Sequence, residues 1–248
     1  MRNGAMNELN LAARPVILFD LDGTLLPMDY PTFEKAYFSG LCRSLREVSP
    51  ELLIRGVWKG VAAMVCNDGS RSNRDAFAEA FSASTGLDYE SREGEFLRYY
   101  HTEFQNCREV CTLTELSGKI VDTLQGKGYT VAIATNPLFP EIATHSRLRW
   151  LGIDPKRFPL VTTFENSGTA KPNPEYYREV CCRLDVQPSD CIMIGNDAQE
   201  DGAAGSVGME VVLVRECLID RTGSDAEKYK SVATLQEILL WAEQLPHM

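Results

Sequence analysis

Short apolar runs recur along this 248-residue chain, and helical stretches separate most of them. The first run covers residues 16–19, and the later ones cover 129–135, 158–164, 191–197 and 211–216. Near-continuous apolar strands of this length are typical of parallel sheets that helices cover on both faces, because neither face meets water. Helical connections between successive strands favour the same arrangement. The sequence therefore predicts an α/β fold built on a doubly wound parallel sheet.

A long helical segment interrupts this pattern directly after the first strand. Within residues 27–108 apolar side chains recur at three- and four-residue spacing, as in amphipathic helices, and no strand is predicted. A turn-rich break over 66–73 leads to a helix start at Asn73. We therefore expect two domains: residues 1–26 and 109–248 form the core, and residues 27–108 form an inserted all-helical cap.

Charged, amide and hydroxyl side chains follow several of the predicted strands. In open α/β sheets, ligands bind outside the carboxyl ends of the strands, at the point where the winding reverses. Four separate stretches supply candidates for such a site: Asp20 with Asp22, Thr135 with Asn136, Lys171, and Asp197 with Asp201. We expect these side chains to meet at one edge of the sheet.

The Asp20 and Asp22 pair has two interpretations. Aspartate before Gly-Thr is common in turns and at helix starts. However, a carboxylate at the end of a buried strand is costly unless a cation, hydrogen-bond donors or water compensate it. Two crowded carboxylates also raise the pKa of one of them unless a cation lies between them. These costs favour a functional pair.

The other strand-end residues also have ordinary alternatives. Thr135 and Asn136 precede a proline, which is common in loops. Lys171 comes just before a predicted helix start at Asn173, a position that favours anions, although a solvated loop lysine fits equally well. Asp201 could cap the short helix that follows it. Asp197 ends an apolar run as Asp20 does, which favours metal binding.

Composition and charge exclude several classes of partner. The formal net charge of -10 argues against nucleic acid or an anionic membrane as the main partner, because both require a basic face. No apolar stretch is long enough for a membrane span, and no signal peptide is visible in residues 1–15. The cysteines are scattered without CxxC spacing. We expect a cytoplasmic protein that is a monomer or a homodimer.

Taken together, the motifs resemble those of the haloacid dehalogenase-like (HAD) hydrolase superfamily. Residues 20–24 are similar to its Asp-x-Asp-Gly-Thr motif, Thr135 to its second motif, Lys171 to its third, and Asp197 with Asp201 to its fourth. The resemblance extends over residues 14–26 and 110–217 and implies a Rossmann-like core. The helical insertion lies where this family places its C1-type cap, as in the phosphatase and beta-phosphoglucomutase-like branch.

The resemblance also implies roles for the candidate residues. Asp20 would be the nucleophile that forms an aspartyl-phosphate, and Asp22 would act as general acid and base. Thr135 and Lys171 would complete the catalytic set by holding the phosphoryl oxygens, with Asn136 and Asp22 also contacting the substrate. Mg²⁺ is the expected cofactor because it prefers hard oxygen ligands. Its expected ligands are the carboxylates of Asp20 and Asp197 and the carbonyl of Asp22, with indirect support from Asp201.

The sequence therefore predicts a magnesium-dependent phosphatase that hydrolyses a small phosphorylated metabolite. A phosphomutase acting on a sugar phosphate through the same site is the main alternative, and a non-catalytic phosphate-binding protein is a weaker one. Dehalogenases of the same superfamily lack an acid at the position of Asp22. No G-x-S-x-G, Walker A or HExxH motif is present.

Substrate selectivity is expected to come from the cap. Arg71, in the polar turn 67–73, is the predicted substrate-binding residue there. Tyr30, Tyr37, Trp58 and Lys59 are further candidates, although helix packing or a solvated surface is the favoured explanation for each of these cap residues, Arg71 included.

Overall fold

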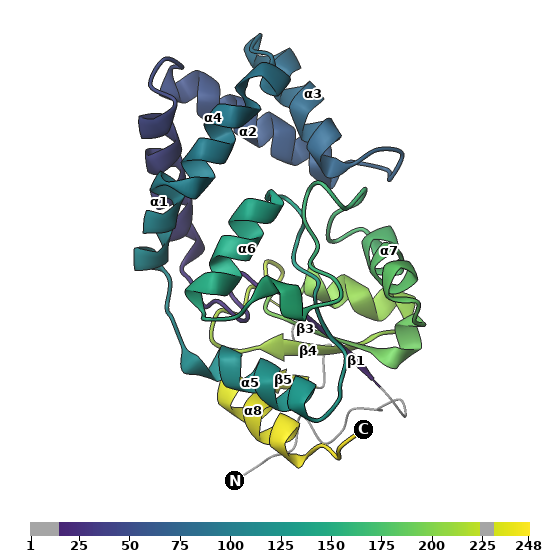
Figure 1. Cartoon of the computed structure of the whole chain (residues 1–248). Helices are drawn as coiled ribbons and strands as arrows, with labels where there is room; N and C mark the ends of the chain where they lie inside the picture. Colours follow the sequence, from purple (N-terminus) through teal and green to yellow (C-terminus); the bar gives the residue numbers. More distant parts are fainter. Residues whose placement is uncertain (1–14, 224–230) are drawn as a thin grey trace.

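A five-stranded parallel sheet forms the centre of the protein (Figure 1). The computed structural model describes residues 15–223 and 231–248. Its strands follow the order β2-β1-β3-β4-β5 across the sheet. Phe19 at the end of β1 pairs with Ile133 of β2 and with Ile194 of β3, so these strands end at a common edge. The strands are β1 (Val16–Phe19), β2 (Val131–Ile133), β3 (Cys191–Gly195), β4 (Glu210–Val214) and β5 (Ser231–Ala233).

Helices cover both faces of the sheet, as the sequence predicts. Side chains alternate along β1: Ile17 and Phe19 join one apolar cluster, and Val16 and Leu18 join the other. This alternation follows the two-residue period of a strand. On the first face lie α5 (Glu115–Gly126) and α8 (Leu235–Gln244), and on the second lies α7 (Pro174–Leu184).

The connections complete the core. Helix α6 (Glu141–Trp150) follows β2, and α7 begins at Pro174 with Asn173 as its N-cap, so the predicted helix start is confirmed. Short 3₁₀ helices are η3 (Pro155–Arg157), η4 (Pro188–Asp190) and η5 (Asp201–Val207).

The segment after β1 is helical, as expected. It contains α1 (Tyr30–Ser44), α2 (Pro50–Val65), α3 (Asn73–Thr85), α4 (Tyr89–His101) and the 3₁₀ helix η2 (Glu103–Val110), which we call the helical insertion. Figure 1 shows α1 to α4 gathered above the sheet. The chain leaves and re-enters the core at adjacent points, where Met28 forms an antiparallel bridge with Cys111. The exact limits of a separate cap, residues 27–108, stay a prediction.

Side-chain caps define where these helices begin. The Asp29 carboxylate accepts the backbone N–H of Thr32 at 3.0 Å, and the Ser72 hydroxyl accepts that of Asp75 at 3.1 Å. Such caps satisfy N–H groups that have no partner within the helix. Helix α3 therefore starts at Asn73, as predicted, and this start positions Asn73 against the core.

Asn73 ties the helical insertion to the core. Its side chain is fully buried and donates to the carbonyl of Thr169 at 3.0 Å, and its backbone N–H donates to the carbonyl of Ser167 at 2.8 Å. Asn67 donates in turn to the Asn73 side-chain oxygen at 2.9 Å. The turn 67–73 is thus attached to the loop that leads to Lys171.

The predicted strand over residues 158–164 is wrong. This segment runs beside β2, but only Val161 forms a bridge there, with Ile133. Instead of a neighbouring strand, the side chain of Asn166 forms hydrogen bonds with the backbone here. It accepts the N–H of Thr163 and donates to the carbonyl of Val161. The short strand β5 had no sequence signal that we recognised, because three residues carry too little periodicity.

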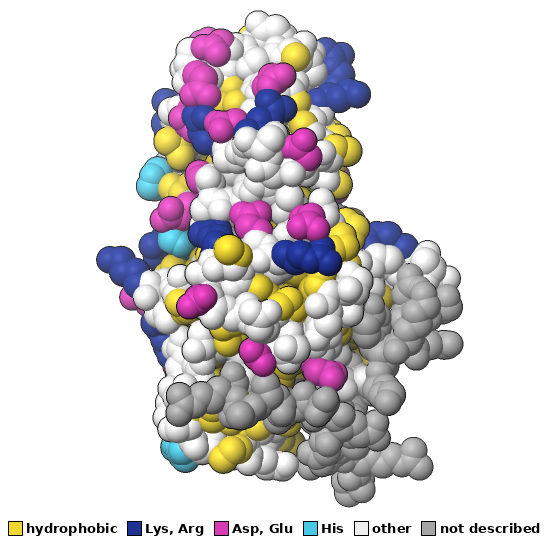
Figure 2. All heavy atoms as spheres, turned by 90° about the vertical axis from the view of Figure 1, so that its right-hand side faces the viewer, with side chains coloured by type: hydrophobic (Ala, Val, Ile, Leu, Met, Phe, Trp, Pro, Cys, Tyr) yellow, Lys and Arg dark blue, Asp and Glu magenta, His cyan; other side chains and the backbone are white. Residues whose placement is uncertain are grey.

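The surface of the helical insertion carries both signs of charge. Figure 2 shows acidic and basic side chains close together over its upper part. Arg74, for example, lies 2.7 Å from a carboxylate oxygen of Glu90 and 2.8 Å from one of Glu93. Among the described residues, no helix has the length and apolar character that a membrane crossing demands.

Two glycines allow α2 and α3 to pack in close contact. A Cβ added at Gly60 would lie 2.3 Å from the Phe77 ring, and one at Gly56 would lie 2.4 Å from the Thr85 methyl group. Contacts this short do not occur between real side chains, so these positions accept only hydrogen. The spacing of the two helices is therefore set at these glycines.

We expect Gly60→Ala to destabilise the protein by about 1–3 kcal/mol, because overpacking outweighs the gain in helix propensity. Urea unfolding measures this change. The matched control is Gly94→Ala in α4, where an added Cβ meets nothing within 4 Å. That change should stabilise by about 0.5–1 kcal/mol. Equal effects at both positions would contradict the packing argument.

Candidate active site

The carboxyl ends of β1 and β3 lie side by side where the winding of the sheet reverses. The chain runs from β1 to β2 on one side and then crosses back to β3 on the other. Asp20 directly follows β1, and its backbone N–H donates to the carbonyl of Ile194 in β3 at 2.9 Å. Asp197 follows β3 by two residues. The two aspartates therefore flank the crevice in which open α/β sheets bind ligands.

The turn after Asp20 depends on glycine at position 23. Gly23 has a φ of +82°, and a Cβ there would lie 2.4 Å from the side-chain nitrogen of Asn196. The Thr24 hydroxyl lies 3.2 Å from Asp20 Oδ2 and 3.1 Å from Asn196 Oδ1. The turn thus holds the Asp20 carboxylate next to the loop that follows β3.

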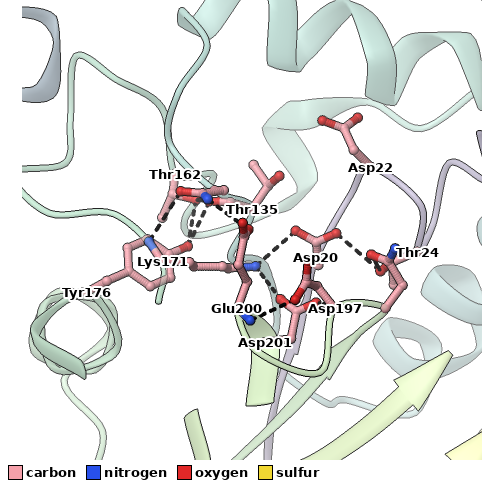
Figure 3. A network of polar contacts seen from close by, with 12 residues as sticks. Asp20, Asp22, Thr24, Thr135, Thr162, Lys171, Tyr176, Asp197, Glu200 and Asp201 are labelled. Carbon is pink, nitrogen blue, oxygen red and sulfur yellow. Dashed lines mark hydrogen bonds and ion pairs between the residues drawn. The ribbon is translucent and has the colours of Figure 1, made fainter. Parts of the chain in front are cut away.

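Lys171 links the two sides of the crevice. Its Nζ is buried and lies 2.9 Å from Asp20 Oδ1 and 2.6 Å from Asp201 Oδ1 (Figure 3). Gly195 makes this approach possible, because a Cβ there would lie 2.1 Å from the Asp201 carboxyl carbon. Three separate chain segments therefore meet at one ammonium group.

Burial and neighbouring charges shift the pKa values of these three groups. Burial raises the pKa of Asp20; Lys171 opposes this shift, and repulsion from Asp22 and Glu200 adds to it. Burial likewise raises the pKa of Asp201 to about 6. Burial opposes the charge of Lys171, but the attraction of Asp20 and Asp201 holds its pKa well above the usual value. The crevice therefore contains more negative charge than Lys171 alone offsets.

Glu200 is a further carboxylate at this site that the sequence interpretation missed. Its Oε2 accepts a hydrogen bond from the Asn136 side chain at 2.9 Å, and burial raises its pKa. Asn136 also accepts the backbone N–H of Lys171 at 3.2 Å. Arg221 forms an ion pair with Asp197, at 2.7 Å. The sequence feature that could have identified Glu200 is its position in the same loop as Asp197 and Asp201.

Thr135 lies at the end of β2, beside this network (Figure 3). The residue is buried, and its carbonyl accepts hydrogen bonds from the hydroxyls of Thr162, at 2.6 Å, and Tyr176, at 2.8 Å. These contacts fix the backbone at the position where the sequence places a phosphate-holding hydroxyl.

The Asp22 carboxylate points away from Asp20 and forms a buried ion pair with Arg147 of α6. Arg147 also donates to the carbonyl of Ala143 at 3.2 Å, and its guanidinium lies 4.3 Å from the ring centre of Phe139. Burial raises the pKa of Asp22, and Arg147 opposes that shift. The sequence interpretation missed Arg147; the available signal was an arginine on the apolar side of a helix.

A cavity of about 190 Å³ lies between the helical insertion and the core, with Asp22 in its lining. Tyr30, Tyr37 and Trp58, three of the cap candidates, also line it. Arg71 does not: its side chain is exposed and forms an ion pair with Glu79. The structure thus brings the core candidates together at the sheet edge and leaves Arg71 outside.

The model of the haloacid dehalogenase-like hydrolases matches residues 15–208 of this chain. The chain belongs to this hydrolase family. The match includes both halves of the crevice and the helical insertion, so the fold and the strand-end motifs come from one family.

Two relatives show the breadth of this HAD-like family. The chain is 26% identical over 238 residues to a ribulose-1,5-bisphosphate 5-phosphatase of Halopiger xanaduensis, covering 90% of this chain and 96% of the relative. It is 26% identical over 213 residues to a phosphoglycolate phosphatase of Colwellia psychrerythraea, covering 82% of this chain and 85% of the relative.

Solved HAD-like structures share the fold. A HAD phosphatase from Thermococcus onnurineus superposes with a TM-score of 0.58 at 21% identity, over 94% of this chain and 100% of that one. A putative beta-phosphoglucomutase from Thermotoga maritima gives 0.56 at 22% identity, over 93% and 100%. At these identities the likeness shows the fold alone.

The donor set of this HAD-like site fits a divalent cation. Within residues 15–223 and 231–248, no three His, Cys, Asp or Glu side chains form a ready-made metal cage. The expected set needs only the Asp20 and Asp197 carboxylates and the Asp22 carbonyl. A divalent cation there would favour the charged form of Asp20, whose pKa is raised by burial and further raised by repulsion from Asp22 and Glu200. The Arg221 side chain, 53% exposed, can leave Asp197 for water.

We expect Arg147→Met to destabilise the protein by about 3–5 kcal/mol, because it leaves the Asp22 carboxylate buried without its cation. The double variant Arg147→Met/Asp22→Leu should recover most of this loss. Urea unfolding of the three proteins measures the coupling. The matched control is Arg149→Met, at an exposed position of the same helix, which should change stability by less than about 0.5 kcal/mol. Simple additivity of the two substitutions would refute the pairing.

Proposed function

We propose that this HAD-like hydrolase is a magnesium-dependent phosphatase that hydrolyses a small phosphorylated metabolite through an aspartyl-phosphate on Asp20. One observation carries the proposal: a buried carboxylate, held at the reversal point of the sheet by Lys171 and Thr24, faces the ligand crevice. A carboxylate nucleophile divides one difficult displacement into two easier steps.

In the first step, an Asp20 oxygen forms a bond to phosphorus while the bond from phosphorus to the leaving alcohol breaks. Asp22 donates a proton to that alcohol. In the second step, Asp22 accepts a proton from water, which attacks phosphorus and releases Asp20 and inorganic phosphate. Asp22 lines the cavity, so a leaving group bound there would lie next to the proposed general acid.

Lys171 and Thr135 would hold the phosphoryl oxygens in both steps, and Asn136 would keep the backbone of Lys171 in place. Preorganised donors of this kind are commonly worth about 10² to 10³ in rate. Mg²⁺ would be bound by Asp20, Asp197 and the Asp22 carbonyl, with Asp201 in support, and would supply positive charge to the phosphoryl group.

We further propose that residues 27–108 act as the cap of this enzyme. The cavity between the helical insertion and the core supports this role, since a cap that closes over a substrate excludes water. The apolar lining also favours a phosphatase over a sugar phosphomutase, because a sugar presents hydroxyls that need hydrogen-bonding partners.

We expect Asp20→Asn to lower turnover by more than about 10³-fold, because an amide cannot form the acyl-phosphate. Phosphate release from a panel of monoesters measures this. The matched control is Asp122→Asn, at an exposed position in α5, which should retain full activity. A folded Asp20→Asn enzyme with a few per cent of wild-type activity would exclude Asp20 as the nucleophile.

We expect EDTA to abolish phosphate release and added Mg²⁺ to restore it, since the surplus of carboxylates in the crevice is otherwise uncompensated. Activity is measured before and after chelation, at constant ionic strength. Undiminished turnover in excess chelator would rule out the metal.

A further inference from the structure

The cavity beside Asp22 is walled mainly by aromatic rings. Helices α1 to α4 contribute Phe33, Tyr37, Trp58, Phe77 and Tyr89 among others, and Phe139 comes from the core loop after β2. Ring faces and edges offer a large apolar contact area to a ligand. This wall therefore selects for an apolar group rather than for a polyol.

Three tyrosine hydroxyls of the wall already have hydrogen-bond partners. The hydroxyls of Tyr37 and Tyr100 lie 2.9 Å apart, and the Tyr30 hydroxyl donates to the Asp22 carbonyl at 3.2 Å. A ligand hydroxyl beside these tyrosines would have to break such contacts or go unpaired, which costs free energy. The Asp22 Oδ1 atom is buried without a partner, so one polar atom of the ligand can be satisfied there, next to the proposed general acid.

The charges around the cavity disfavour an anionic leaving group. Among the described residues that line it, the charged ones are Asp22 and Glu34, both acidic. Three arginines of this region are paired: Arg147 with Asp22, Arg71 with Glu79, and Arg74 with Glu90 and Glu93. Lys35 and Lys59 follow the lining residues Glu34 and Trp58 in the chain but do not line the cavity themselves. A carboxylate or second phosphate in the cavity would therefore meet repulsion from its charged lining residues.

The volume of the cavity is sufficient for a ring-sized occupant. The cavity measures about 190 Å³. An apolar protein cavity of about 150 Å³ accommodates benzene. The space beside Asp22 is therefore large enough for one ring or a short branched chain.

We propose that the cavity binds the uncharged, mainly apolar alcohol portion of a phosphate monoester, about the size of a single ring. The inference rests on the proposed function, because Asp22 in the cavity lining is the group that would protonate this alcohol. The preferred substrate class is thus an apolar alkyl or arylalkyl phosphate, in contrast to the anionic phosphoglycolate named for one relative.

Three alkyl phosphates test the proposal on the wild-type enzyme with Mg²⁺. Benzyl phosphate fills the cavity, ethyl phosphate leaves it empty, and 2-phosphoglycolate carries a carboxylate into it. We expect kcat/KM for benzyl phosphate to exceed that for ethyl phosphate at least tenfold, with 2-phosphoglycolate the poorest of the three. Equal values, or a preference for 2-phosphoglycolate, would overturn the inference.

A charge placed in the wall provides a second test. Val61 of α2 lines the cavity and is half-buried, whereas Val65, one turn further along the same helix, is exposed and outside the lining. Val61→Lys should lower kcat/KM for benzyl phosphate at least tenfold and raise it for 2-phosphoglycolate. Val65→Lys, the matched control, should preserve the wild-type order. Identical effects of the two variants would overturn the assignment of the cavity.

The phosphatase proposal and the cavity assignment fail in different ways. Hydrolysis of all three esters without a preference for the apolar one would support the phosphatase proposal and would overturn the cavity assignment. Failure to release phosphate from any of them would overturn the phosphatase and the inference with it. Since the comparison of the three esters uses the wild-type enzyme, it tests the cavity assignment even if the Val61→Lys protein misfolds.

Discussion

The rest of the site depends on the ion pairs that the buried ammonium of Lys171 forms with Asp20 and Asp201. The ammonium lies between carboxylates that come from the end of β1 and from the loop after β3, and Lys171 itself comes from the loop before α7. None of these charges would be tolerated alone in that position, because an unpaired buried charge costs several kcal/mol. The ammonium therefore opposes the rise that burial causes in the pKa of Asp20, and it joins segments 151 residues apart in sequence.

Much of this arrangement could be predicted from the sequence. The apolar runs that contain β1, β2, β3 and β4 are buried strands whose side chains alternate between two helix-covered faces. Because parallel strands end at the same edge, Asp20 and Asp197 had to meet there. Lys171 was less certain, since a lysine before a helix is also an ordinary surface residue. Its burial beside Asp201 depends on Gly195, and that tertiary relation cannot be seen in local sequence.

Other features depend on packing between elements distant in sequence. Arg147 lies on the buried side of α6, but its partner appears only when α6 is placed beside Asp22. The aromatic cavity combines rings from four helices and the core, each of which reads as ordinary helix packing in isolation. The error at residues 158–164 has a similar origin. The sequence of an apolar run is the same whether its backbone forms hydrogen bonds with a neighbouring strand or with the side chain of Asn166.

Asn73 has a mechanical consequence. It fastens the start of α3 to the carbonyls of Ser167 and Thr169, and Thr169 is only two residues before Lys171. Any outward swing of the helices must either break these bonds or pull on the segment that carries the lysine. Asn73 therefore couples the position of α3 to that of the loop whose lysine pairs with Asp20, although the asparagine lies far from both in sequence.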